Sequence, residues 1–117
     1  MTDFNYKKHP FEKRKDESSK MLSKHPNSLC VIIEKSDNDN TIADIDKHKY
    51  LVPKELTVGQ LLYVVRKRIH LTPEQAIFLY INHSLPPSAA SLESLYNLYK
   101  DDDGFLYIKY TGENTFG

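Results

Sequence analysis

Residues 57–69, which read TVGQLLYVVRKRI, contain the clearest structural signal in the chain. Thr57 is followed three residues later by Gln60, the pattern of a capping box, in which each side chain bonds the other residue's backbone N–H at a helix start. Apolar residues then recur at the spacing of one buried helix face, at Val58, Leu61, Leu62, Val65 and Ile69. The segment is therefore predicted to be an amphipathic helix that lies across one face of a sheet.

Four predicted strands flank this helix. Before it lie residues 29–33, a continuous apolar run typical of a buried strand, and residues 49–52, a short strand closed by Pro53. After it lie residues 76–81 and 105–110, separated by a short helix capped by Ser91. The order strand, strand, helix, strand, short helix, strand predicts an α+β fold of the ubiquitin-like β-grasp type, with a four-stranded mixed sheet. A split β-α-β fold fits less well because it begins strand, helix, strand.

The chain divides into three parts. Residues 1–27 are predicted to be a helical extension, because Pro10 suits a helix start and Pro26 stops it. A narrow stripe of Phe11, Ser18, Met21 and Leu22 is expected to pack this extension on the domain. Residues 28–110 form the predicted β-grasp domain, and residues 111–117 form a polar tail that we expect to be flexible.

Composition limits the classes of function. The 117 residues suit one domain, and the net charge of zero disfavours a nucleic-acid reader, which usually carries a basic excess. Residues 1–70 carry 14 basic and 10 acidic side chains, so one face is expected to be basic. The longest apolar run has six residues, against about 20 for a membrane-spanning helix, so the chain is expected to be cytosolic by default.

The sequence contains no pattern for catalysis or for a cofactor. Cys30 is the only cysteine and sits in an apolar run, so neither a disulfide nor a catalytic thiol is predicted. The five His residues lack metal-ligand spacing, and there is no Gly-rich phosphate loop. The acidic run at residues 101–103 is interpreted as a solvated turn. We therefore expect no enzyme activity, no metal and no cofactor.

The sequence resembles the autophagy-related ubiquitin-like modifiers, the family that includes GABARAP and yeast autophagy-related protein eight. The matching stretches are HPFEKR at 9–14, DKHKYLVP at 46–53, LTVGQ at 56–60, RKRIHL at 66–71, LPP at 85–87, DGFLY at 103–107 and GENTFG at 112–117. The resemblance covers essentially the whole chain. It implies a β-grasp fold with two N-terminal helices, in agreement with the order of elements.

The resemblance implies a modifier that works through its C-terminal glycine, Gly117. In the family, an activating enzyme adenylates this glycine, a conjugating enzyme carries it as a thioester, and the product is an amide with phosphatidylethanolamine. A cysteine protease removes residues that follow the glycine in precursors. The implied locations are the cytoplasm and the autophagosome membrane, with the vacuole or lysosome as a further site. The alternative is a ubiquitin-like interaction domain that is never conjugated and binds trafficking or microtubule-associated partners.

The predicted strand at residues 49–52 is a candidate sheet edge that a partner peptide can extend. The family binds adaptors and cargo receptors through an aromatic-x-x-aliphatic motif. The resemblance places the aromatic pocket at Glu17, Met21, Cys30, Lys49, Leu51 and Phe105, the aliphatic pocket at Tyr50, Val52, Pro53, Leu56, Leu61 and Val64, and contacts to acidic flanks at Lys47, Lys49 and Arg68. The alternative is that these apolar residues are core and these charges a solvated face.

A second partner surface is implied at Ile77, Phe78, Leu79 and Tyr80. The alternative there is an ordinary strand whose residues alternate between buried and exposed. Two departures from the family pattern bear on partner choice. Ser28 stands where Arg is frequent, and Leu61 replaces a common Phe, which is expected to make the aliphatic pocket roomier.

Overall fold

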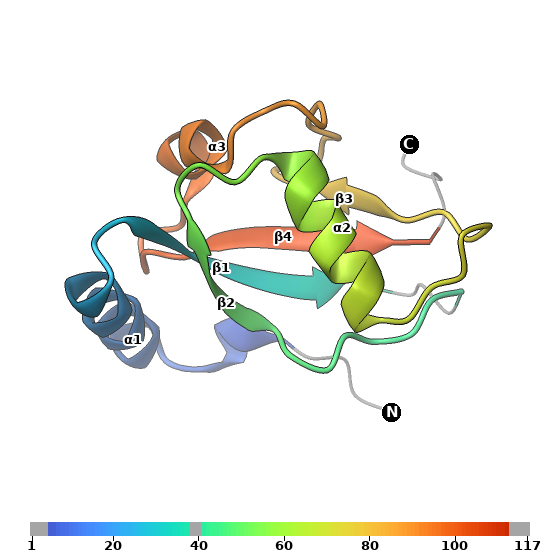
Figure 1. The fold of residues 1–117 in the computed structure, drawn as a ribbon. Helices are drawn as coiled ribbons and strands as arrows, with labels where there is room; N and C mark the ends of the chain where they lie inside the picture. The colour runs from blue at the N-terminus through green and yellow to red at the C-terminus, as the bar shows by residue number, and fades with distance from the viewer. Residues whose placement is uncertain (1–4, 38–40, 113–117) are drawn as a thin grey trace.

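A computed structural model describes residues 5–37 and 41–112. Its elements, in chain order, are η1 (Tyr6–Lys8), α1 (Phe11–Lys24), β1 (Ser28–Lys35), β2 (Lys49–Pro53), α2 (Val58–Arg68), β3 (Phe78–Tyr80), α3 (Leu92–Tyr99) and β4 (Leu106–Thr111). The four strands form one sheet in the order β2-β1-β4-β3 (Figure 1). The pair of β1 and β4 is parallel and the two outer pairs are antiparallel, so the predicted β-grasp fold with a mixed sheet is confirmed.

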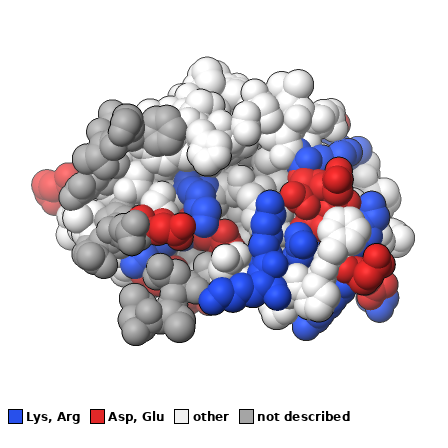
Figure 2. Space-filling view, turned by 180° about the vertical axis from the view of Figure 1, so that it is seen from behind, with Lys and Arg blue, Asp and Glu red and all other residues white. Residues whose placement is uncertain are grey.

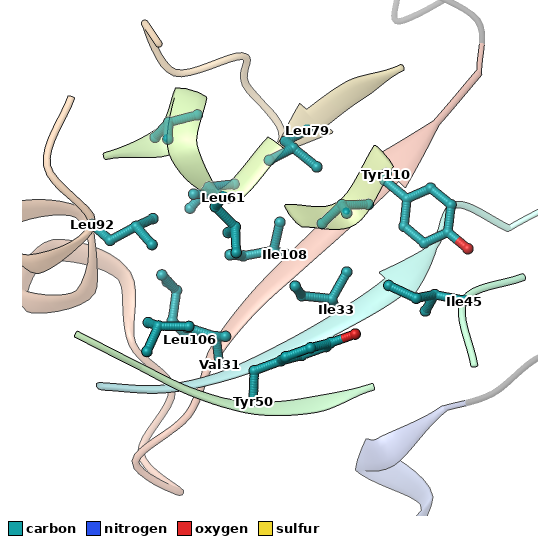
Figure 3. Packing of buried hydrophobic residues seen from close by; sticks show 14 of the residues in the cluster. Val31, Ile33, Ile45, Tyr50, Leu61, Leu79, Leu92, Leu106, Ile108 and Tyr110 are labelled. Carbon is teal, nitrogen blue, oxygen red and sulfur yellow. The ribbon is translucent and has the colours of Figure 1, made fainter. Parts of the chain in front are cut away.

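β1 separates two hydrophobic cores because its successive side chains point to opposite faces of the sheet. Val31 and Ile33 belong to the main core, which α2 covers. Figure 3 shows Leu61 of α2 pointing into this core toward Ile108. Cys30 and Ile32 belong to a second, smaller core on the opposite face, where η1 and α1 pack. The remaining members of the second core are Tyr6 and Phe105, with Met21, Leu22, Leu51 and Tyr107 packed against it.

α2 begins as its sequence predicts. The Thr57 hydroxyl accepts a hydrogen bond from the Gln60 backbone N–H at 3.2 Å, and the Gln60 side chain accepts one from the Thr57 N–H at 2.9 Å. The predicted apolar face is buried at Val58, Leu61, Val65 and Ile69, with Leu62 half-buried. The capping box and the buried helix face are therefore both confirmed.

The expected extent of the third strand and the expected packing of Phe11 both need correction. The third strand covers three residues rather than 76–81, because β4 offers partners only to Phe78, Leu79 and Tyr80. Asn82 and His83 then adopt positive φ angles of 52° and 64°, which turn the chain out of the sheet. Phe11 does not pack into the expected seam: it is 41% exposed, with the Arg14 guanidinium 5.6 Å from its ring centroid.

The acidic run at 101–103 lies in a turn with Asp102 exposed, as predicted, but the turn is not solvated throughout, because Asp103 is fully buried. Its carboxylate accepts hydrogen bonds from Arg14 Nη1 at 2.5 Å, from the Tyr107 hydroxyl at 2.6 Å and from the Phe105 backbone N–H at 2.9 Å. The Ser18 hydroxyl donates to the Asp103 carbonyl at 2.5 Å. Two residues of α1 are thereby joined to the turn that precedes β4. We call Arg14, Asp103 and Tyr107 the clasp.

Gly104 allows this turn to approach α1 closely. Its φ of +91° lies in the left-handed region that side chains other than glycine rarely adopt. A Cβ atom at this position would also collide with the Ser18 hydroxyl. Both constraints select glycine.

A second buried carboxylate holds η1. Glu34 on β1 is 3% exposed and accepts a hydrogen bond from the Tyr6 backbone N–H at 2.8 Å. Lys109 on the neighbouring β4 lies 3.1 Å from the same carboxylate and compensates its charge. The extension is therefore attached to the sheet at both η1 and α1. Within the described residues, no helix has both the length and the hydrophobicity needed to cross a bilayer.

Substituting Arg14→Met should lower the free energy of unfolding by about 2–4 kcal/mol, because Asp103 would stay buried without its cation. Urea unfolding followed by circular dichroism measures this change. Lys20→Met is the matched control, since Lys20 pairs with Asp16 on the exposed face of the same helix and should cost less than about 1 kcal/mol. Equal effects of the two substitutions would contradict a role for the clasp in stability.

Candidate functional site

β2 is an edge strand of the sheet, and its side chains face the two cores in turn. Lys49 and Leu51 face the side on which α1 packs, and both are partly exposed. Tyr50 and Val52 face the main core under α2 and are buried. A peptide that pairs with this edge would therefore find one lining on each side of the sheet.

The six residues predicted for the aromatic pocket come together between α1 and β2. Cys30 and Phe105 are fully buried and support this site from below, and Met21 and Leu51 are half-buried beside them. Lys49 Nζ lies 3.3 Å from Glu17 Oε2, so an ion pair joins β2 to α1 at the surface. The Tyr6 hydroxyl donates to the other Glu17 oxygen. The site thus has an apolar floor and a charged rim.

The Cys30 thiol is part of this apolar floor. Burial raises its pKa to about 11, although the nearby Lys49 charge acts in the opposite direction. The thiol lies 3.9 Å from the Ser18 carbonyl oxygen and is protonated at neutral pH. A protonated, buried thiol is a poor nucleophile, so its role here is packing.

The predicted aliphatic pocket is only partly at the surface. Tyr50, Val52 and Leu61 are at most 8% exposed and belong to the main core. The accessible members are Pro53 and Val64, with Leu56 half-buried between β2 and α2. Three of the six predicted residues therefore lie in the core beneath the surface that Leu56, Pro53 and Val64 form, and do not line an open pocket.

An open hollow of about 530 Å³ continues from this point along α2. It shares Leu56 and Val64 with the aliphatic pocket and adds Tyr63, whose exposed fraction is 62%. The other lining residues are Thr57, Gly59, Gln60, Ser88 and Ala89. Sequence reasoning missed Tyr63 because it lies off the apolar face of α2. Ser88 and Ala89 come from a loop that has no local signal.

The three predicted flanking cations have different partners. Arg68, the last residue of α2, donates from Nε at 3.2 Å and from Nη2 at 3.1 Å to one carboxylate oxygen of Asp46. Lys49 is paired with Glu17, as described above. Lys47 Nζ lies 5.1 Å from the centroid of the Tyr50 ring, a cation–π contact. Figure 2 shows that basic and acidic side chains are interspersed on the face opposite α2.

Tyr50 supports the site mainly from within the core. Its hydroxyl is buried and has no hydrogen-bond partner within residues 5–37 and 41–112. Burial raises its pKa, against the influence of Arg68. Because its side chain packs on the main core, replacing Tyr50 would disturb the fold as well as any peptide contact (Figure 3).

The residues predicted for a second partner surface are mostly inaccessible. Ile77 and Leu79 are 6% and 4% exposed and pack in the main core. Tyr80 is 6% exposed, and Phe78 is half-buried. Gly117, the predicted conjugation site, lies outside the described residues. Among those that are described, no cluster of three or more His, Cys, Asp and Glu side chains could hold a metal ion.

Comparisons with known proteins agree with this architecture. The family described as "Autophagy protein Atg8 ubiquitin like" matches residues 13–117. Autophagy-related protein 8 of Coccidioides immitis is 58% identical over 93% of this chain and 92% of its own length, and that of Emericella nidulans is 57% identical over the same shares. The crystal structure of Trypanosoma brucei ATG8 superposes with a TM-score of 0.89 at 47% identity, covering 99% of this chain and 100% of that chain.

Cys30 should react slowly with a thiol reagent such as DTNB at pH 8, because the buried thiol is protonated and must be exposed before it reacts. The absorbance of released thiolate measures the rate, and the same chain in 6 M guanidinium provides the fully exposed control. A native rate within about tenfold of the unfolded rate would mean that the pocket floor is open.

Proposed function

Because the chain belongs to the Atg8 family of autophagy ubiquitin-like proteins, we propose that it is a modifier joined through Gly117 to phosphatidylethanolamine on autophagosomal membranes. In this role it supports autophagosome formation and docks cargo receptors that carry an aromatic-x-x-aliphatic motif. It requires an activating and a conjugating enzyme, and a cysteine protease that trims precursors and reverses lipidation. It passes between the cytoplasm and the autophagosome membrane, and from there to the vacuole or lysosome.

One observation carries the docking part of the proposal. Residues of α1, β1 and β2, together with Phe105, meet in one apolar, rimmed site beside an edge strand. A peptide that adds to β2 gains backbone hydrogen bonds from the edge, and its alternate side chains reach opposite faces of the sheet. An aromatic side chain would sit over Cys30 and Phe105, and an aliphatic one near Leu56 and Val64.

The conjugation part rests on family membership and on chain length. Gly117 lies six residues beyond Thr111, where β4 ends. Six extended residues span at most about 20 Å, enough for a terminal carboxylate to enter an enzyme while the domain stays folded. Phosphatidylethanolamine would supply two acyl chains, which anchor stably where a single chain is marginal. Phe78, the one half-buried residue of β3, is proposed as the centre of a second, smaller partner surface, with the buried Ile77, Leu79 and Tyr80 supporting it from the core.

Replacing Gly117→Ala should abolish or strongly reduce thioester formation and lipidation, because the added methyl group crowds the activated carboxylate. Purified family activating and conjugating enzymes, ATP and phosphatidylethanolamine liposomes provide the assay, read as a lipidated band on a gel. The circular dichroism spectrum should not change. If the variant is lipidated like the parent, the modifier proposal fails and the non-conjugated interaction domain is favoured.

Replacing Leu51→Ala should weaken binding of an aromatic-x-x-aliphatic peptide by about 5- to 30-fold, because a half-buried wall of the aromatic pocket is lost. Isothermal titration calorimetry measures the affinity. Leu98→Ala is the control, since Leu98 is 70% exposed on α3 and takes no part in the groove. Unchanged affinity in a folded Leu51→Ala variant would place the peptide elsewhere.

A further inference from the structure

Arg68, which the family resemblance assigns to the acidic flank of a bound peptide, already pairs with an anion of the chain itself. Arg68 directs two N–H groups at a single oxygen of Asp46, at 3.1 and 3.2 Å. Asp46 lies three residues before β2 begins at Lys49, and Arg68 ends α2, so the pair joins two segments that border the groove. The Asp46 side chain is 69% exposed and that of Arg68 is 38% exposed. An incoming anion can therefore reach the site and replace Asp46.

The neighbouring cations provide a contrast. Lys49 is held by Glu17, which is only 29% exposed and also accepts the Tyr6 hydroxyl, so this carboxylate is fixed from both sides. Asp46, by comparison, is held only by Arg68 within the described residues. Lys47 lies over the Tyr50 ring and forms no ion pair within residues 5–37 and 41–112. Of the two cations that form ion pairs, Lys49 and Arg68, it is Arg68 whose partner is the more exposed and the more easily displaced.

We propose that Asp46 is a specificity-determining residue, an internal competitor that sets how much negative charge a bound peptide must carry beside its motif. This inference rests on the proposed peptide groove. A single carboxylate on the peptide would exchange one ion pair for another and gain little. A phosphorylated side chain carries a charge of about −1.5 to −2 at pH 7 and three acceptor oxygens, so it displaces Asp46 with a net gain. The chemistry favoured at this position is a phosphorylated serine or threonine.

The test uses three peptides with the same aromatic-x-x-aliphatic motif and serine, aspartate or phosphoserine at one position just before the aromatic residue. Affinities are measured by calorimetry for the parent chain, Asp46→Asn, and Asp46→Asn combined with Arg68→Gln. Asp16→Asn is the matched control: it removes an equally charged, exposed carboxylate from the Asp16–Lys20 pair on α1, so the net charge changes by the same amount.

In the parent, the aspartate peptide should bind less than about twofold more tightly than the serine peptide, and the phosphoserine peptide about two- to fivefold more tightly. Asp46→Asn should raise the aspartate advantage to about two- to fivefold and leave the serine peptide unchanged. The gain should shrink in 1 M salt, and it should disappear when Arg68→Gln is added. Asp16→Asn should behave like the parent.

Any of the following results would overturn the inference. If Asp46→Asn strengthens binding of the serine and aspartate peptides equally, Asp46 changes the shape of the groove and does not compete for Arg68. If Asp16→Asn gives the same increase in the aspartate advantage, the effect comes from the net charge of the protein and not from Asp46 itself. If the aspartate advantage persists when Arg68→Gln is added, Arg68 is not the cation that binds the peptide carboxylate. If the serine peptide binds none of the variants, the groove proposal itself falls, whereas serine-peptide binding without an Asp46 effect overturns only this inference.

Discussion

The arrangement of the second core depends on the hydrogen bonds that surround the buried carboxylate of Asp103. A fully buried anion is tolerable only when cations and N–H or O–H donors surround it, and here these come from α1, from β4 and from the backbone of Phe105. Satisfying this one group fixes the position of α1 against the turn before β4. Glu17 and Met21, on the same helix, are thereby set opposite β2. The wall of the aromatic pocket is thus positioned by a bond that no peptide would contact.

The proposed groove depends on the alternation of side chains along two neighbouring strands. β1 contributes to both cores, and β2 at the sheet edge repeats the alternation with Lys49 and Leu51 on one side and Tyr50 and Val52 on the other. A ligand at this edge therefore meets two different environments without any rearrangement of the backbone. In the proposed docking mode, the apolar residues on the α1 side would receive the aromatic anchor of the motif, and the half-buried Leu56 on the α2 side would receive the aliphatic anchor.

The sequence was informative where structure depends on neighbours along the chain. The capping box at Thr57 and the spacing of apolar residues in α2 are local signals, and both predicted the observed helix. Asp103 was misread as solvated because its partner, Arg14, lies 89 residues away. Tyr50 was assigned to a pocket surface because a match to a family motif identifies the position in the sequence but does not indicate whether the side chain is buried. The Asp46–Arg68 pair, 22 residues apart and formed across a loop, likewise has no periodic signal.

The parallel pairing of β1 with β4 has a consequence for how the chain acquires its structure. β4, the last strand along the chain, lies in the interior of the sheet between β1 and β3, so the sheet stays in separate parts until residues 106–111 exist. During synthesis from the N-terminus, the hairpin of β1 and β2 can form early, but the two cores cannot close. Such non-local pairing slows folding because a long loop must be ordered first. The proposed peptide groove, which Phe105 supports from below, is therefore among the last features of this domain to form, so a nascent chain cannot engage a partner there before residues 105–111 have been made.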